Sequence, residues 1–172
     1  MLYLLDASVL ITANNTYYPV DRVPEYWEWL LHMSQSGNIK MPLEIFEEVK
    51  DGPKDADKDL LFGWIQQEDC KSQLILQEPV NPIHVQTVIA SGYAPDLKDD
   101  ELEKLGRDPF LVAYALAQPT MRCVVTVEVS RPSMKRANRK LPDVCAAVGV
   151  TCSDPFALLR TLGFRTDWKK HL

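Results

Sequence analysis

The 172-residue chain has few of the sequence features, such as excess basic charge, grouped metal ligands or long apolar runs, that mark specialised classes of protein. It has no excess of basic residues, since 24 Asp and Glu against 19 Lys and Arg give a formal net charge of -5. Its overall charge therefore does not indicate a nucleic-acid-binding protein, although a local basic cluster can override the average. No repeat or linker divides the chain, and 46% of its residues are hydrophobic. We expect a single domain, residues 1–172, that is large enough to bury a substantial core.

Soft metal ligands and membrane-spanning segments are also scarce. The three histidines are scattered, and the four cysteines, Cys70, Cys123, Cys145 and Cys152, lack the CxxC spacing of zinc sites. Their apolar neighbours predict reduced, packed thiols in a cytosolic protein. No stretch is long and apolar enough to span a bilayer, and no basic region precedes the apolar N-terminal run. We therefore expect a soluble, cytoplasmic protein with no membrane partner.

What the sequence does contain is an apolar run at residues 1–11 that carries one carboxylate near its middle. The run of Leu and Tyr followed by Asp6-Ala7-Ser8 predicts a buried strand that ends at Asp6. Ligands bind at the carboxyl ends of the strands in open α/β sheets. Asp6 is therefore either part of a site or the polar end of the strand and the cap of a following helix, where Asp is a favoured residue.

Short apolar strands and amphipathic helices alternate along the rest of the chain. This alternation predicts an α/β fold with a parallel sheet and helices on both of its faces. The pattern at residues 74–76 fits a strand and a turn equally, and the charged residues 51–59 predict a break. Further strands are expected at 39–41, at 122–126 and near Val150, and helices at 8–14, 24–37, 43–50, 60–67, 82–91, 99–106, 107–117, 141–148 and 155–162.

The helix expected at residues 43–50 carries three glutamates. At about 100° per residue, Glu48 borders the apolar face of this helix, whereas Glu44 and Glu47 lie further round toward solvent. Glu48 is thus either a solvated residue at the margin of the helix or a carboxylate that leans into a site.

The motif Asp-Pro-Phe occurs twice, and both copies are expected to begin a helix. In such a signature the Asp carboxylate accepts hydrogen bonds from unpaired backbone N–H groups, and the Pro takes the first helical position. Asp108 also heads a buried row of apolar residues at i+3, i+4 and i+7, which is unusual for a carboxylate. Because Asp154 begins the last helix with the same motif, the motif by itself indicates no chemistry.

The β-branched run at residues 122–126 predicts a second buried strand that leads to Glu128. A dense basic segment follows this strand. It is either a solvated loop or an arm that contacts phosphates beside an acidic pocket. The segment contains Arg131, Lys135, Arg136, Arg139 and Lys140.

In a parallel sheet, the strand ends and the helix starts bring four acids to one edge: Asp6, Glu48, Asp108 and Glu128. Two like charges about 4 Å apart repel by roughly 4 kcal/mol at an effective dielectric constant near 20. Such a group therefore needs protonation or a divalent cation. Ligand sets made only of oxygen select Mg²⁺ or Mn²⁺, and the matching chemistry is hydrolysis of a phosphodiester.

Four segments of the chain resemble, in order, the four motifs of the PIN-domain nucleases. They are Leu4-Leu5-Asp6-Ala7-Ser8 and the segments 42–49, 108–115 and 124–128. The resemblance covers nearly the whole chain, and it is to the compact bacterial type related to the VapC toxins of toxin–antitoxin pairs. It implies a three-layer α/β/α sandwich with a central, mostly parallel sheet, cleavage of RNA that depends on Mg²⁺ or Mn²⁺, and a cognate antitoxin. The resemblance leaves open whether the protein forms a homodimer.

The resemblance also implies roles for individual residues. Asp6, Glu48 and Asp108 would be the principal catalytic and metal-binding acids. Glu128 stands where the fourth motif usually has Asp, and its longer side chain favours a contact to the metal through water. Ser8 and Thr126 would support the pocket by hydrogen bonding. The second-motif residue could also be Glu47 or Glu44, and Asp143 is an extra acid with no assigned role.

The sequence therefore favours a metal-dependent endoribonuclease that selects single strands. Two alternatives belong to different functional classes. A haloacid-dehalogenase-like phosphatase needs a second acid two residues after its nucleophilic Asp, where this chain has Ser8. A catalytically silent PIN-like domain that binds RNA or a protein is the alternative that we retain, although all four motif positions are acidic. In the favoured hypothesis the RNA backbone is held by Arg131, Lys135, Arg136 and Arg139.

Overall fold

The structure, a computed structural model, describes residues 1–50 and 59–172. Apart from Asp59, the break expected at residues 51–59 lies outside these described residues. The described part of the chain contains a four-stranded sheet in which every neighbouring pair is parallel, in the order β2-β1-β3-β4. The strands are β1 (Leu2–Leu5), β2 (Ile39–Lys40), β3 (Arg122–Val125) and β4 (Thr151–Ser153).

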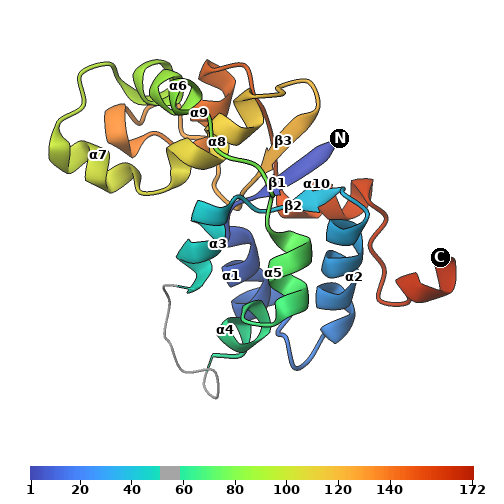
Figure 1. Cartoon of the computed structure of the whole chain (residues 1–172). Coiled ribbons are helices and arrows are strands. Elements are labelled where there is room, and N and C mark those ends of the chain that lie inside the picture. Colours follow the sequence, from blue (N-terminus) through green and yellow to red (C-terminus); the bar gives the residue numbers. More distant parts are fainter. Residues whose placement is uncertain (51–58) are drawn as a thin grey trace.

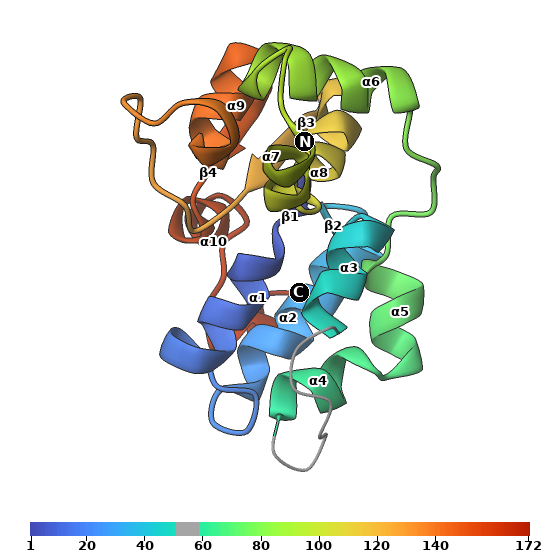
Figure 2. The same ribbon diagram turned by 90° about the vertical axis from the view of Figure 1, so that its left-hand side faces the viewer.

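Helices cover both faces of the sheet, with α1–α5 on one side and α6–α9 on the other (Figures 1 and 2). The predicted α/β fold with a central parallel sheet is thereby confirmed, and its layers agree with an α/β/α sandwich. The helices are α1 (Ala7–Thr12), η1 (Ala13–Tyr17), α2 (Pro24–Gln35), α3 (Leu43–Lys50), α4 (Leu60–Ile65), α5 (Glu68–Leu74), α6 (Pro82–Thr87), η2 (Val88–Tyr93), α7 (Asp99–Leu105), α8 (Asp108–Leu116), η3 (Arg136–Asn138), α9 (Leu141–Ala147), α10 (Pro155–Thr161) and η4 (Trp168–His171).

The strand order creates a switch point between β1 and β3. The chain first runs from β1 outward to β2 and later returns to place β3 on the other side of β1. The connections on the two sides leave in opposite directions, which opens a crevice at the carboxyl ends of these two strands. Leu5 pairs with Val125 in the sheet register, so Asp6 and Thr126 leave the sheet at the same level.

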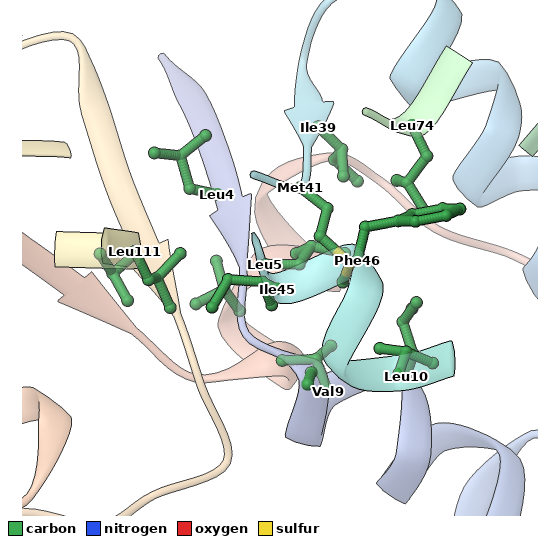
Figure 3. Close-up of a cluster of buried hydrophobic side chains, with 14 of the residues drawn as sticks. Leu4, Leu5, Val9, Leu10, Ile39, Met41, Ile45, Phe46, Leu74 and Leu111 are labelled. Atoms are coloured by element: carbon green, nitrogen blue, oxygen red, sulfur yellow. The ribbon is translucent and has the colours of Figure 1, made fainter. Parts of the chain in front are cut away.

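The core lies between β1 and the helices beneath it. Figure 3 shows Leu5 of β1 among Ile45 and Phe46 of α3 and Val9 of α1, all of which are buried. Trp27 and Trp29 of α2 are also buried and pack in the core. All four cysteines are free, and only Cys152 is partly accessible, in agreement with the prediction of packed thiols.

Two local features differ from the predictions. Helix α5 was not predicted, because its only buried residues are Cys70 and Leu74 and a single i, i+4 pair gives too weak a periodicity. The helices predicted at 8–14 and 82–91 each begin as an α-helix and end in a π-helical turn, η1 and η2. At residues 74–76, Ile75 forms an isolated parallel bridge with Met41, which resolves the ambiguity in favour of a short extended contact.

We expect Leu4→Ala to lower the free energy of unfolding by roughly 2–5 kcal/mol, because it leaves a cavity in the core beneath the site. Leu4 is fully buried, whereas Leu43, at the first turn of α3, is 49% exposed. The same change at Leu43 should cost well under half as much. Urea unfolding of both variants measures the difference, and equal losses would contradict the proposed position of the core.

Candidate functional site

Asp6 stands at the carboxyl end of β1, where two hydroxyls fix its side chain. Its backbone N–H donates to Val125 O at 2.9 Å, and its Oδ2 accepts hydrogen bonds from Thr126 Oγ1 at 2.7 Å and from the Ser8 hydroxyl. Asp6 occupies the N-cap position of α1, but its carboxylate makes no capping hydrogen bond of good geometry. The carboxylate is thus held by the hydroxyl of Ser8 in α1 and the hydroxyl of Thr126 just after β3, rather than used to cap the helix.

Burial dominates the electrostatics of Asp6, which is only 6% exposed. Desolvation raises the pKa of its carboxyl, the hydrogen bonds from Ser8 and Thr126 oppose that rise, and the nearby charge of Glu128 adds to it. Asp6 therefore lies in an environment in which negative charge is poorly compensated.

The two Asp-Pro-Phe motifs differ by one position in their register on the helix. Asp154 is the N-cap of α10, and its Oδ1 accepts a hydrogen bond from Ala157 N at 2.9 Å. Asp108 is instead the first residue inside α8, after Arg107 as N-cap, and no described residue donates a hydrogen bond to its carboxylate. The expectation that the Asp108 carboxylate caps its helix is wrong. With this shift by one residue, the Asp108 carboxylate does not cap the helix, and it lies near the charges of Asp6, Glu128 and Glu48.

The charges of the other three predicted acids act on Asp108. Burial is the largest cause that raises the pKa of Asp108, to about 8, and the charges of Asp6, Glu128 and Glu48 follow in that order. Lys140 opposes this rise. Four carboxylates that lie between positions 6 and 128 of the sequence thus share one electrostatic neighbourhood at the carboxyl edge of the sheet.

The glutamates of α3 are not arranged as the helical periodicity predicts. Glu48 is the exposed one, whereas Glu44 and Glu47 are half-buried, so the predicted order of exposure is wrong. The reason is that α3 packs against α8 as well as α1, and α8 covers the side that carries Glu44. Glu47 pairs with Lys50 at 3.1 Å. Glu48 is the α3 glutamate whose charge raises the pKa of Asp108.

Glu128 is anchored to the start of α9. One of its carboxylate oxygens accepts from Lys140 Nζ at 2.6 Å, and the other accepts from Leu141 N at 2.7 Å. Its own N–H donates to Thr126 Oγ1 at 3.1 Å. Thr126 therefore links Asp6 to the backbone of Glu128, and Lys140 supplies a positive charge at the margin of the acidic group.

The predicted basic arm divides into anchored and exposed side chains. Arg136 pairs with Glu101 and Asp96 at 2.7 Å, and Arg139 donates to the carbonyl oxygens of Gly92 and Asp143. These two guanidinium groups hold the segment against η2 and α7. The Arg131 and Lys135 side chains are exposed, and a role in RNA binding stays a prediction for all four residues.

Asp143 has a structural environment that explains its burial. Its two carboxylate oxygens accept from Ser130 Oγ at 2.5 Å and from Arg131 N at 2.7 Å. These hydrogen bonds, with that from Ser130 first, lower the pKa of Asp143. Asp143 thus orders the loop after Glu128 rather than joining the four acids.

Tyr93 is a member of the site that the sequence did not reveal. It is 7% exposed, and its buried hydroxyl has no hydrogen-bond partner among the described residues. Burial and then the charge of Asp108 raise the pKa of Tyr93. The residue ends the π-helical turn η2, and π-helical turns are frequent at functional sites. Sequence patterns do not identify this residue, because a single Tyr in an expected loop carries no periodicity.

The donor set of this site consists of oxygen atoms only, which suits Mg²⁺ or Mn²⁺. In residues 1–50 and 59–172, no three His, Cys, Asp or Glu side chains are grouped tightly enough to hold a metal ion by themselves. Mg²⁺ typically binds through one or two carboxylates and retains several waters. The buried carboxylate of Asp6 and the half-buried carboxylate of Asp108 fit that mode of binding, whereas Glu128 is already paired with Lys140.

Comparison with known sequences identifies one protein family. The sequence model described as "Domain of unknown function (DUF4411)" matches residues 3–166, which include all four acids of the site. No curated protein is significantly similar to the chain. Among the described residues, no helix has the length and apolar character needed to cross a membrane.

Asp108 should make the stability of the protein depend on pH. Its folded-state pKa is raised from 3.8 to about 8, so the folded state holds the proton more tightly than the unfolded state. That stabilising contribution is complete below pH 4 and is lost as the pH rises toward 8. Asp108→Asn should therefore exceed the wild type in unfolding free energy at pH 8.5 by at least about 1 kcal/mol, and by much less at pH 4.

Urea unfolding at the two pH values measures this effect. Asp154→Asn is the matched control, because it changes the same motif at an exposed cap where Asn serves as well as Asp. It should leave the stability nearly unchanged at both pH values. A wild type that is at least as stable as Asp108→Asn at pH 8.5 would show that the Asp108 carboxylate is not buried among like charges.

Proposed function

The chain belongs to the DUF4411 family, and we propose that it is a metal-dependent endoribonuclease that hydrolyses phosphodiester bonds of RNA. One observation carries the proposal: the carboxylates of Asp6, Asp108, Glu48 and Glu128 share the switch point of a parallel sheet. This arrangement is costly for folding, because Asp6 is buried, Asp108 is half-buried, and the nearby positive charge of Lys140 compensates only in part. A site of this kind is retained when its charge serves a ligand.

Asp6 and Asp108 would hold Mg²⁺ or Mn²⁺, with Glu48 reaching its water shell, and the ion would supply an acidified water and neutralise charge on the phosphate. The protein's own residues prepare that chemistry. The hydroxyls of Ser8 and Thr126 fix one oxygen of Asp6, which leaves its other oxygen to point into the crevice. The Lys140 ammonium at the rim attracts a phosphate and holds Glu128 in place.

RNA is proposed as the substrate because the four acids occupy the positions of the four PIN-domain motifs. The exposed side chains of Arg131 and Lys135 lie in the loop that follows β3, where they would contact the phosphate backbone on one side of the cleaved bond. The same resemblance supports a cytoplasmic toxin that is paired with a cognate antitoxin, and a homodimer.

A catalytically silent domain that binds RNA or a protein is the second candidate. It is favoured by the pairing of Glu128 with Lys140 and by the lack, among the described residues, of a group of three acids at ligand spacing. In that case the Lys140 ammonium, instead of a metal ion, would balance the charge of the acids.

Wild-type protein with Mg²⁺ or Mn²⁺ should cleave a mixed pool of single-stranded RNA, and EDTA should stop the reaction. Asp6→Asn or Asp108→Asn should lower the cleavage rate at least about 100-fold, because each removes a ligand of the ion. Asp69→Asn makes the same change on the exposed surface of α5 and should retain the wild-type rate. Gel analysis of end-labelled RNA gives the rates.

Circular dichroism establishes that each variant is folded. RNA that stays intact in the presence of folded wild-type protein and either metal would contradict the nuclease proposal. RNA binding without cleavage would favour the silent domain. Equal cleavage by all variants would indicate a contaminating nuclease and would remove the four acids from the mechanism.

A further inference from the structure

A pocket of about 260 Å³ opens beside the acidic group, between the helical segment α1–η1 and α10. Figure 2 shows these segments on the same side of the molecule, below the carboxyl ends of β3 and β4. The walls of the pocket are aromatic and apolar. They include Tyr17, Tyr18, Tyr26, Val129, Phe156 and Leu159.

We propose that this pocket binds an amino-bearing nucleobase of the RNA strand, next to the phosphate that is held at the four acids. The inference rests on the proposed nuclease function for the position of that phosphate. The pocket itself is defined by residues that the four-acid site does not use, apart from Glu128.

The aromatic rings at the mouth of the pocket suit a flat, stacked ligand. Tyr17 of η1 and Phe156 of α10 meet edge to face, with ring centroids 5.0 Å apart at 82°. Both rings remain accessible, at 50% and 41% exposure, although they are large apolar groups. Tyr18 is held behind them by stacking on Tyr26 at 4.5 Å. Exposed aromatic side chains beside a positively charged segment are the usual platform for unpaired bases.

Glu128 connects the pocket to the acidic group. It lines the pocket, and its charge also contributes to the raised pKa values of Asp6 and Asp108. A nucleotide whose phosphate lies at Asp6 and Asp108 would therefore have the pocket next to it, because Glu128 is common to both places.

The charges at the rim favour a base over a phosphate or an acidic peptide. Glu128 and Asp154 border the pocket, and because Glu128 is paired with Lys140, Asp154 is the carboxylate that repels anions and accepts hydrogen bonds from exocyclic amino groups of bases. One Asp154 oxygen accepts from Ala157 N, and no described donor bonds the other. The volume is also below the roughly 300–1,000 Å³ of pockets for drug-sized ligands, so a single planar ring system is the matching size.

The test uses the full-length Asp108→Asn protein, so that the RNA is not cut, with Mg²⁺ and a short single-stranded RNA that carries 2-aminopurine. Stacking in the pocket should quench the fluorescence of this amino-bearing base. Tyr17→Leu and Phe156→Leu should each weaken binding by at least about fivefold, since stacking on one ring contributes that factor or more. The matched variants Tyr17→Phe and Phe156→Tyr keep the ring and should bind as tightly as the parent.

Cleavage of the same unlabelled RNA by the wild-type protein is measured in parallel. A failure of the nuclease proposal can then be told apart from a failure of the pocket proposal. Quenching that depends on the two rings supports the pocket, whether or not the wild type cleaves. If the wild type cleaves but the probe is not quenched, or if the Leu variants bind as tightly as the parent, the inference is overturned. An apolar segment of a partner protein would then be the remaining candidate ligand of the pocket.

Discussion

The structure depends on the buried carboxylate of Asp6 and the half-buried carboxylate of Asp108, whose charges act on each other at the carboxyl edge of the sheet. The parallel pairing of β1 with β3 fixes the first of them, because it delivers Asp6 and Thr126 to the same level beyond the strands. Helix α8 fixes the second, because Asp108 lies inside its first turn and not at its cap. Both carboxylates are thus positioned by elements of the core, one by a strand and the other by a helix.

The surroundings of these two acids limit the cost of their burial without removing it. Hydroxyl groups of Ser8 and Thr126 stabilise the ionised form of Asp6, and Lys140 is the cation that faces the group. Lys140 is itself paired with Glu128, so its charge is shared. A divalent cation would complete the balance, which is why the geometry suits metal-dependent hydrolysis of a phosphodiester better than it suits a purely structural role.

Much of this arrangement is predictable from the sequence because it follows from apolar and β-branched runs that extend over several residues. The apolar run before Asp6 and the β-branched run before Thr126 identify two buried strands, and their parallel pairing then brings distant acids to one edge. The features that the sequence does not predict depend on single positions or on tertiary packing. Asp108 and Asp154 stand in identical motifs, yet α8 begins at Asp108 itself, whereas α10 begins one residue after Asp154.

Tertiary packing likewise determines how exposed a side chain is and which groups it pairs with. Glu48 is more exposed than Glu44 because α8 covers one side of α3, which no periodicity within α3 can indicate. Arg136 and Arg139 appear as free charges in the sequence, but their partners are Glu101, Asp96 and two backbone oxygens from other segments. Tyr93 and the aromatic pocket at Phe156 likewise emerge only from contacts between elements far apart in the chain.

The central claim is that Asp108 is an acid kept in the fold for a cation, and NMR titration of its carboxyl carbon in the wild-type protein tests this most directly. The account predicts a midpoint near pH 8 in the absence of divalent ions and a shift to lower pH when Mg²⁺ is added, because the ion and the proton compete for the same oxygens. A midpoint near pH 4 that Mg²⁺ leaves unchanged would contradict it.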